Sequence, residues 1–130
     1  LKDLNEVRQL LEMKIAEKAA QHRTPEDITR MRACLDQCRQ AVESGNTAAA
    51  IDADIAFHTA IAAAARNEIL SDLYRAVSIH LKKGFTTLYS DTSSFRRSHD
   101  FHEQLLEAII AGNRKQAWDM VMKIIDHVDR

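Results

Sequence analysis

Asp54 and His58 are the residues of this chain whose types and spacing most suggest chemistry. They are four residues apart, so in a helix both side chains lie on one face, one turn from each other. Ile51 and Ile61 share that face, which is otherwise apolar, and a polar group buried there is costly unless a partner satisfies it. The stretch 51–61 therefore predicts a carboxylate and an imidazole that point into the protein interior, towards partners on other helices.

His102 is the third residue that we assign to this group, because it lies at helical spacing on the apolar side of a later segment. Two imidazoles and a carboxylate suit Zn²⁺, Ni²⁺, Mn²⁺ or Fe²⁺, and three such ligands leave coordination positions for water or a small carboxylic acid. The sequence therefore predicts a divalent metal (Zn, Ni or Mn) as a candidate cofactor at Asp54, His58 and His102. The competing interpretation is a pair of core histidines satisfied by hydrogen bonds.

Arg8 and His80 are candidates for further polar contacts to a bound ligand. His80 falls on or beside the inner stripe of its predicted helix. Arg8 stands one turn before Glu12, so it either forms an ordinary ion pair along the helix or extends into a central pocket to hold an anion. The predicted ligand-binding set is Arg8, His80, Asp54, His58 and His102.

The remaining chemistry-bearing residues favour structural roles. His127 lies beside Asp126, which predicts a solvated, charged turn at the end of the chain. Cys34 and Cys38 are four apart, a spacing that favours buried free thiols over a local disulfide or a zinc knuckle. The sequence has no Gly-rich phosphate loop, G-x-S-x-G, H-E-x-x-H or C-x-x-C motif, so no catalytic alternative of comparable strength emerges.

Composition favours helices and narrows the class of protein. The 130 residues are enough for one domain, and 45% of them are hydrophobic, with three Gly and one Pro. The formal net charge is −1 and the charges are interspersed, so this chain by itself lacks the basic surface of a nucleic-acid or membrane binder. It shows no bilayer-length apolar run and no leader pattern, which predicts a soluble, cytoplasmic protein.

Hydrophobic periodicity divides the chain into six predicted helices. The first ends near His22, and its apolar positions are Leu4, Val7, Leu11, Ile15 and Ala19. The second begins at the cap Thr24 and ends at Gly45, and the third runs to about Arg66. The fourth follows Asn67, and its inward positions are Leu70, Leu73, Val77, Leu81 and Leu88.

The fifth predicted helix runs from Phe95 to Gly112, and the sixth then reaches the end of the chain. Short links between helices favour antiparallel neighbours. The sequence thus predicts an all-α fold, an antiparallel bundle of about six helices that forms one domain of residues 1–130. The third, fifth and sixth helices are expected to face a common centre.

Three segments carry a resemblance to a known family. They are Val7-Arg8-Gln9-Leu10-Leu11-Glu12, Asp54-Ile55-Ala56-Phe57-His58 with Asn67-Glu68-Ile69-Leu70, and His102-Glu103-Gln104-Leu105-Leu106-Glu107-Ala108-Ile109 with Gly112-Asn113. In this order they resemble the C-terminal FCD domain of the FadR subfamily of GntR-type bacterial transcription regulators. The resemblance covers essentially the whole chain.

The resemblance implies a helical effector-binding and dimerisation domain. Such a domain binds a small organic acid and passes this event to an N-terminal winged-helix DNA-binding domain. That domain is absent from this sequence, in keeping with Leu1 lying inside an amphipathic pattern. The implied partners are a small anionic metabolite, a second copy of the chain, and DNA through the absent domain only.

The resemblance also implies a metal site of one Asp and three His. Asp54, His58 and His102 match three of these positions, and the fourth falls on Ile124, three residues before His127. A helix turns by roughly 300° over three residues, so His127 would reach the site only after a shift of the last helix. Either three protein ligands and an effector complete the site, or Asp and His bind the effector directly.

Our interpretation is a ligand-sensing domain of a transcription regulator, not an enzyme. Two other classes stay open at this point. A metal-dependent enzyme also uses three protein ligands and an open position, although no general base accompanies them here. A purely structural dimerisation module would have a dry, filled interior around His58.

Overall fold

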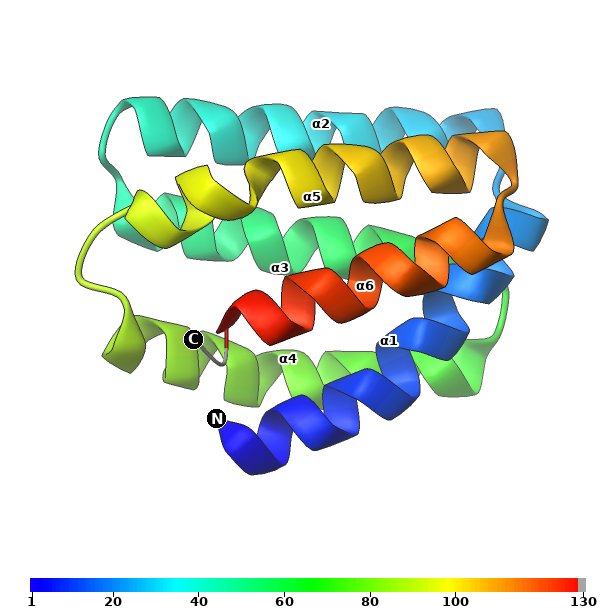
Figure 1. Cartoon of the computed structure of the whole chain (residues 1–130), viewed down its shortest axis with the longest axis horizontal. Helices are drawn as coiled ribbons and strands as arrows, with labels where there is room; N and C mark the ends of the chain where they lie inside the picture. The colour runs from blue at the N-terminus through cyan, green and yellow to red at the C-terminus, as the bar shows by residue number, and fades with distance from the viewer. Residues whose placement is uncertain (129–130) are drawn as a thin grey trace.

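The computed structural model describes residues 1–128, which form six α-helices and no strands (Figure 1). The helices are α1 (Lys2–His22), α2 (Pro25–Glu43), α3 (Thr47–Ala64), α4 (Glu68–Leu88), α5 (Ser93–Ala111) and α6 (Arg114–Val128). Successive helices alternate in direction, which confirms the predicted all-α bundle.

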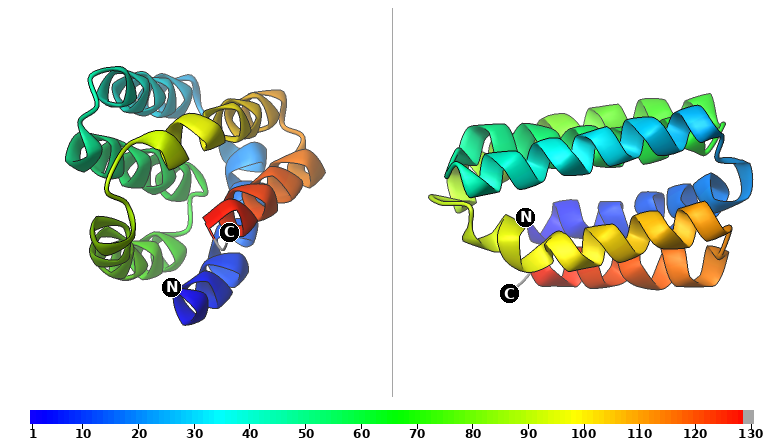
Figure 2. Two further views of the ribbon diagram at one scale, coloured as in Figure 1. Left: turned by 60° about the vertical axis from the view of Figure 1, so that its left-hand side comes forward. Right: turned by 90° about the horizontal axis from the view of Figure 1, so that it is seen from above.

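The helices form two layers of three, which the two views of Figure 2 separate clearly. One layer holds α2, α3 and α4, and the other holds α5, α6 and α1. Helix α1 packs against α3, α4, α5 and α6, so it touches both layers. Side chains on its inner face therefore reach the centre of the bundle.

None of the described helices is both long enough and apolar enough to cross a membrane.

Local sequence signals set the helix ends. Thr24 and Asp27 form a reciprocal capping box at the start of α2, in which each side chain accepts a hydrogen bond from the other residue's backbone N–H. Asn46 and Asn67 cap α3 and α4 through single hydrogen bonds, in which their side-chain oxygens accept from the backbone N–H of Ala49 and of Leu70. Gly112 ends α5 with a φ of 70°, the left-handed conformation that glycine adopts without strain.

One end of the bundle is held together by two arginines. The Arg66 guanidinium lies 2.7 Å from the Asp27 carboxylate, which joins the end of α3 to the start of α2. Arg23, just after α1, donates two hydrogen bonds to the carbonyl oxygen of Ile110 near the end of α5.

Val77 and Leu81 of the predicted inner face of α4 are buried, as expected, but the rest of this face is rotated in the structure. Leu73 and Leu88 are 47% and 50% exposed, whereas Tyr74 and Phe85 are buried. The prediction followed the leucine spacing, but the larger aromatic side chains occupy the core-facing stripe because they bury more apolar surface there.

The inner face of α1 is also different from the predicted stripe. Val7 is 44% exposed, whereas Asn5, Arg8 and Glu12 are almost completely buried. The N-terminal half of α1 therefore presents polar side chains to the centre of the bundle. Burial of such groups is costly unless they are paired, so this face must have partners on other helices.

Replacing Asp27, one of the two partners in the capping box of α2, tests how the start of this helix is stabilised. We expect Asp27→Ala to lower the free energy of unfolding by about 2 kcal/mol, because it removes a helix cap and a buried acceptor. The control is Asp36→Ala on the same helix, whose exposed pair with Arg39 should contribute less than about 0.5 kcal/mol. Urea denaturation measures both values. Equal effects of the two substitutions would contradict this explanation.

Candidate metal centre

Five ionisable side chains from three helices meet in the centre of the bundle. Asp54 and His58 come from α3, His102 from α5, and Arg8 and Glu12 from α1. Each of the five residues is at most 7% exposed. The structure thus brings together four of the five residues in the predicted ligand-binding set, and it adds Glu12.

The three predicted metal ligands lie within coordinating distance of one another. His58 Nε2 is 3.3 Å from His102 Nε2. The Asp54 Oδ1 atom lies 2.9 Å from His102 Nε2 and 3.9 Å from His58 Nε2. One ligand atom from each residue therefore falls within a sphere small enough for a single ion.

In both imidazole rings the second nitrogen atom, Nδ1, contacts an oxygen atom. His102 Nδ1 is 2.8 Å from the carbonyl oxygen of Ser98, one turn earlier on α5. His58 Nδ1 is 3.0 Å from Glu12 Oε1. Because these oxygens are acceptors, each Nδ1 carries a proton. His102 Nε2 also faces an acceptor, Asp54 Oδ1 at 2.9 Å, and donates to it as long as no metal is bound.

Helical spacing explains how each pair is positioned. Asp54 and His58 are one turn apart on α3, as the sequence predicted. On α1, Arg8 Nε lies 2.5 Å from Glu12 Oε2, the ion pair expected at this spacing. Arg8 forms the predicted ion pair with Glu12 and also lines the central cavity, while its binding of an anion stays a prediction.

The charges in the cluster shift the pKa values of its acids. Burial alone would raise the pKa of the Glu12 carboxyl, but the charges of Arg8 and His58 lower it to about 2. Burial opposes ionisation of Asp54 too, and the hydrogen bond to His102 brings its pKa to about 2. Both groups are therefore carboxylates at neutral pH.

His102 shows the complementary shift. Burial would lower its pKa, but the hydrogen bond and the charge of Asp54 raise the pKa above its ordinary value. With both imidazoles neutral, one arginine and two carboxylates give the cluster a net charge of −1. Because the net charge of this buried site is negative, electrostatics favours the binding of a cation.

The separation of the two imidazole nitrogens fits a divalent metal such as Zn²⁺, whereas the 3.9 Å from Asp54 Oδ1 to His58 Nε2 means that the carboxylate would have to turn to complete a tetrahedral site. Two nitrogen ligands at about 2.05 Å from a tetrahedral ion are about 3.3 Å apart, which is also the separation of the two Nε2 atoms. Hydrogen bonds from Nδ1 to a carboxylate or a carbonyl are the usual outer contacts of metal-bound histidines. His102 Nδ1 has such a hydrogen bond to the Ser98 carbonyl, and His58 Nδ1 lies 3.0 Å from the Glu12 carboxylate.

A small internal cavity lies beside the cluster. Its volume is about 20 Å³, room for about one water molecule. Arg8, Asp54 and His102 line one part of it, and Ile124, at the position matched to the family's fourth ligand, lines another. Among the described residues the group able to hold an ion consists of three side chains, so an ion would keep an open position.

The structure does not bring His80 to this cluster. His80 is exposed on α4 and lines a surface hollow with Leu1 and Leu4 of α1. The predicted inner position of His80 was wrong for the same reason as that of Leu73, since the core-facing stripe of α4 runs through Tyr74 and Phe85.

His127 was predicted to lie in a solvated turn, and this prediction was wrong. The residue is half-buried in the last turn of α6 and lines the same cavity as Asp54 and His102. Its Nε2 atom is 3.2 Å from both the hydroxyl and the carbonyl oxygen of Ser94 on α5. The neighbouring acidic residues suggested solvent, whereas the partner on α5 is 33 residues away in the sequence.

Sequence reasoning named Glu12 only as the partner of Arg8 and did not find Tyr74. Asn5, Arg8 and Glu12 follow one another at spacings of three and four, a polar stripe that could have signalled a buried polar face on α1. Tyr74 of α4 is 1% exposed, and its hydroxyl has no hydrogen-bond partner in the described part of the chain. Burial raises the pKa of this hydroxyl well above its ordinary range.

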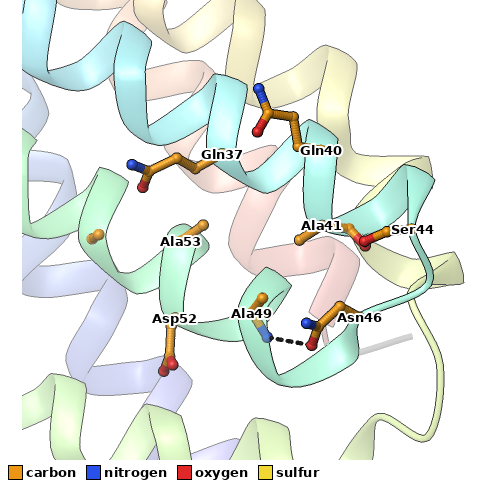
Figure 3. A pocket seen from close by; sticks show the side chains of 9 residues that line it. Gln37, Gln40, Ala41, Ser44, Asn46, Ala49, Asp52 and Ala53 are labelled. Atoms are coloured by element: carbon orange, nitrogen blue, oxygen red, sulfur yellow. Dashed lines mark hydrogen bonds between the residues drawn. The ribbon is translucent and has the colours of Figure 1, made fainter.

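A larger hollow on the surface lacks comparable chemistry. Figure 3 shows this groove, where Gln37 and Gln40 of α2 face Ala49 and Ala53 of α3. Its one ionisable residue, Asp52, lies 3.1 Å from Lys82. The central cluster therefore remains the candidate site.

Comparison with known proteins supports a regulatory role for the domain. Residues 3–127 match the FCD domain family. The chain is 34% identical over 134 residues to the HTH-type transcriptional regulator LutR of Bacillus subtilis (strain 168), across 99% of the chain and 60% of LutR. It is also 34% identical over 120 residues to the Uxu operon transcriptional regulator of Escherichia coli (strain K12), across 88% of the chain and 47% of that regulator.

Solved structures share the fold. E. coli McbR/YncC superposes with a TM-score of 0.89 at 22% identity, covering 99% of this chain and 65% of that one. Streptococcus agalactiae GntR gives a TM-score of 0.84 at 24% identity, covering 97% of this chain and 56% of that one.

The chain thus spans about half to two thirds of the length of the relatives it matches. The resemblance of the three sequence segments is confirmed, and so is the expectation that the protein does not belong to an enzyme family. From the family match and two regulators at 34% identity, we conclude that this chain is an FCD domain of the GntR family of transcription regulators.

Proposed function

We propose that this domain senses a small organic acid through a divalent metal held by Asp54, His58 and His102. The observation that carries the proposal is the fixed orientation of the two imidazole rings. Glu12 and the Ser98 carbonyl lie beside the two Nδ1 atoms, so both Nε2 atoms turn towards one position next to Asp54. A metal ion at this position would replace the proton that His102 Nε2 donates to Asp54.

The open side of the site favours an anionic ligand. A bound divalent ion would bring the charge of the cluster from −1 to +1, and a carboxylate would then bring it to zero. The metal supplies a coordination position for one carboxylate oxygen. Arg8 lines the same cavity, and its contacts with Glu12 and Asn5 leave further N–H groups for a second oxygen.

Helix α1 can transmit the effect of acid binding to the rest of the regulator. Arg8 and Glu12 connect it directly to the site, and α1 also packs against α3, α4, α5 and α6. We propose that a DNA-binding domain precedes α1 in the whole protein and that the acid changes the placement of α1. The acid can shift the DNA-binding equilibrium only by the difference between its affinities for the two placements of α1.

Homodimerisation and a cytoplasmic location belong to the same proposal. Support for a dimer comes from large apolar side chains that are exposed on α1 and α4 and that a partner surface could cover. Leu10 is 76% exposed and Ile69 is 69% exposed. A second copy of the chain is the partner that we propose.

Zinc titration of the metal-free protein tests the metal claim. We expect about one equivalent of Zn²⁺ to bind and to raise the melting temperature, because binding stabilises the folded state. His102→Ala should weaken zinc binding by about 100-fold or more, since it removes a ligand rather than an outer contact. His99→Ala is the matched control, an imidazole on the same helix that pairs with Glu103 instead. Unchanged melting temperature with zinc, nickel and manganese would refute the metal claim.

The pH dependence of zinc binding gives a separate test. Metal binding requires neutral imidazoles, and Asp54 raises the pKa of His102, so zinc must displace a proton from His102 at mildly acidic pH. We expect the affinity to fall as the pH is lowered below about 7, with proton uptake by the buffer on zinc binding. Calorimetry in buffers of different ionisation enthalpy measures how many protons the protein releases when zinc binds. A zinc affinity that is constant down to about pH 5.5 would rule out imidazole ligands.

Arg8→Lys separates anion binding from metal binding. Lysine keeps the charge beside Glu12 but loses the planar pair of donors, so we expect affinity for a carboxylate such as succinate to fall about tenfold. Zinc affinity should change by less than about threefold, because Arg8 is not a ligand. Calorimetry of the zinc-loaded variant with succinate provides the values. Loss of zinc affinity with no separate effect on succinate would contradict the role of Arg8.

A further inference from the structure

A second polar group lines the central cavity, apart from the three candidate ligands. Ser94, Ser98 and His102 follow one another at intervals of four residues, so they share one face of α5. His127 of α6 contacts Ser94 at 3.2 Å. Ser94, Ser98 and His127 all line the cavity that also contains Asp54.

The fold does not require these hydroxyl groups. Ser94 and Ser98 are 9% and 6% exposed, and alanine at either position would be a better helix former. The Ser98 hydroxyl has one long contact, 3.4 Å to the Phe95 carbonyl oxygen of its own helix. The weakly used Ser98 hydroxyl is therefore available to a group that occupies the cavity, whereas the Ser94 hydroxyl already contacts His127.

The cavity is therefore lined by polar residues beyond the candidate ligands and by apolar residues. Ser98 is about 6 Å and Ser94 about 12 Å from His102 along the helix axis. Phe85, Phe95, Ile124 and Val128 supply apolar lining. A ligand whose carboxylate binds beside Asp54 and His102 would direct its other end towards Ser98 and Ser94.

We infer that Ser94, Ser98 and His127 form a second anchor, which binds an oxygen atom at the far end of the acid. The inference rests on the function proposed above and narrows it. The ligand class becomes short carboxylic acids that carry a hydroxyl group or a second carboxylate.

The hydrogen-bonding capacity of the second anchor fits this class. The Ser94 carbonyl can only accept, so the nearby His127 Nε2 carries a proton and donates to it. The Ser94 and Ser98 hydroxyls can then donate to a ligand oxygen. A hydroxyl and a carboxylate both accept such bonds, whereas a methyl group does not.

Binding must enlarge the cavity, which has room for about one water molecule. Tyr89 is the least buried of the aromatic residues in its lining, and it lies directly after α4. Its ring packs on Phe85 and Phe95 with centroid distances of 5.3 and 5.0 Å. Outward movement of Tyr89 would open the cavity next to Ser94 and leave the metal ligands in place.

Three acids of similar size test the second anchor on the zinc-loaded protein. Propionate has no oxygen at its far end, 3-hydroxypropionate has a hydroxyl there, and succinate has a carboxylate. We expect at least one of the last two to bind about tenfold more tightly than propionate by calorimetry, since one hydrogen bond to a buried site has about this effect. Preference for 3-hydroxypropionate assigns a hydroxy acid, and preference for succinate assigns a dicarboxylic acid.

The double variant Ser94→Ala/Ser98→Ala tests whether these residues cause the preference. We expect the ratio of the dissociation constants to fall towards one. Ser78→Ala, a serine of α4 whose hydroxyl also contacts a carbonyl three residues earlier, should keep the wild-type ratio. Circular dichroism checks that both variants fold.

Two results would overturn the inference, and they differ from failure of the proposed function. If propionate binds as tightly as the other two acids, or if the double variant keeps the preference, the second anchor does not exist although acid sensing stands. If none of the three acids binds to the zinc-loaded protein, both the second anchor and the proposed function are wrong.

Discussion

The contact between Glu12 and His58 is the interaction on which the centre of this domain depends. It fixes one imidazole from α3 against α1, while the Ser98 carbonyl fixes the other imidazole from within α5. Arg8 in turn holds the second oxygen of Glu12. Three helices from two layers are thereby connected through polar atoms, in a bundle whose other contacts are mostly apolar.

This arrangement has an energetic consequence. Five ionisable groups removed from water would destabilise the fold if any of them lacked a partner. Each of the five has a charged or hydrogen-bonding neighbour, and both carboxyl groups have a pKa of about 2 in spite of burial. The cluster nevertheless removes five ionisable groups from water, a cost that an apolar core of the same size would avoid. We take this residual cost as the mark of a binding site.

Local signals made much of the fold predictable. The caps Thr24 and Asn67, and the left-handed Gly112, act within a few residues, so the helix bounds followed from the sequence. Residues one turn apart, such as Asp54 and His58, were placed for the same reason. The face of α4 was not predictable from leucine spacing, because two neighbouring apolar stripes competed and the tertiary packing selected Tyr74. The contact between His127 and Ser94 likewise joins separate helices, and no local pattern encodes it.

The first coordination shell of the metal-loaded protein tests the central claim most directly. X-ray absorption at the zinc edge should show two imidazole nitrogens from His58 and His102, with oxygen atoms from Asp54 and from water or an added acid completing the shell. The carboxylate contribution should increase when succinate is added. A shell with sulfur ligands, or one without the imidazole signature, would contradict our account of the site.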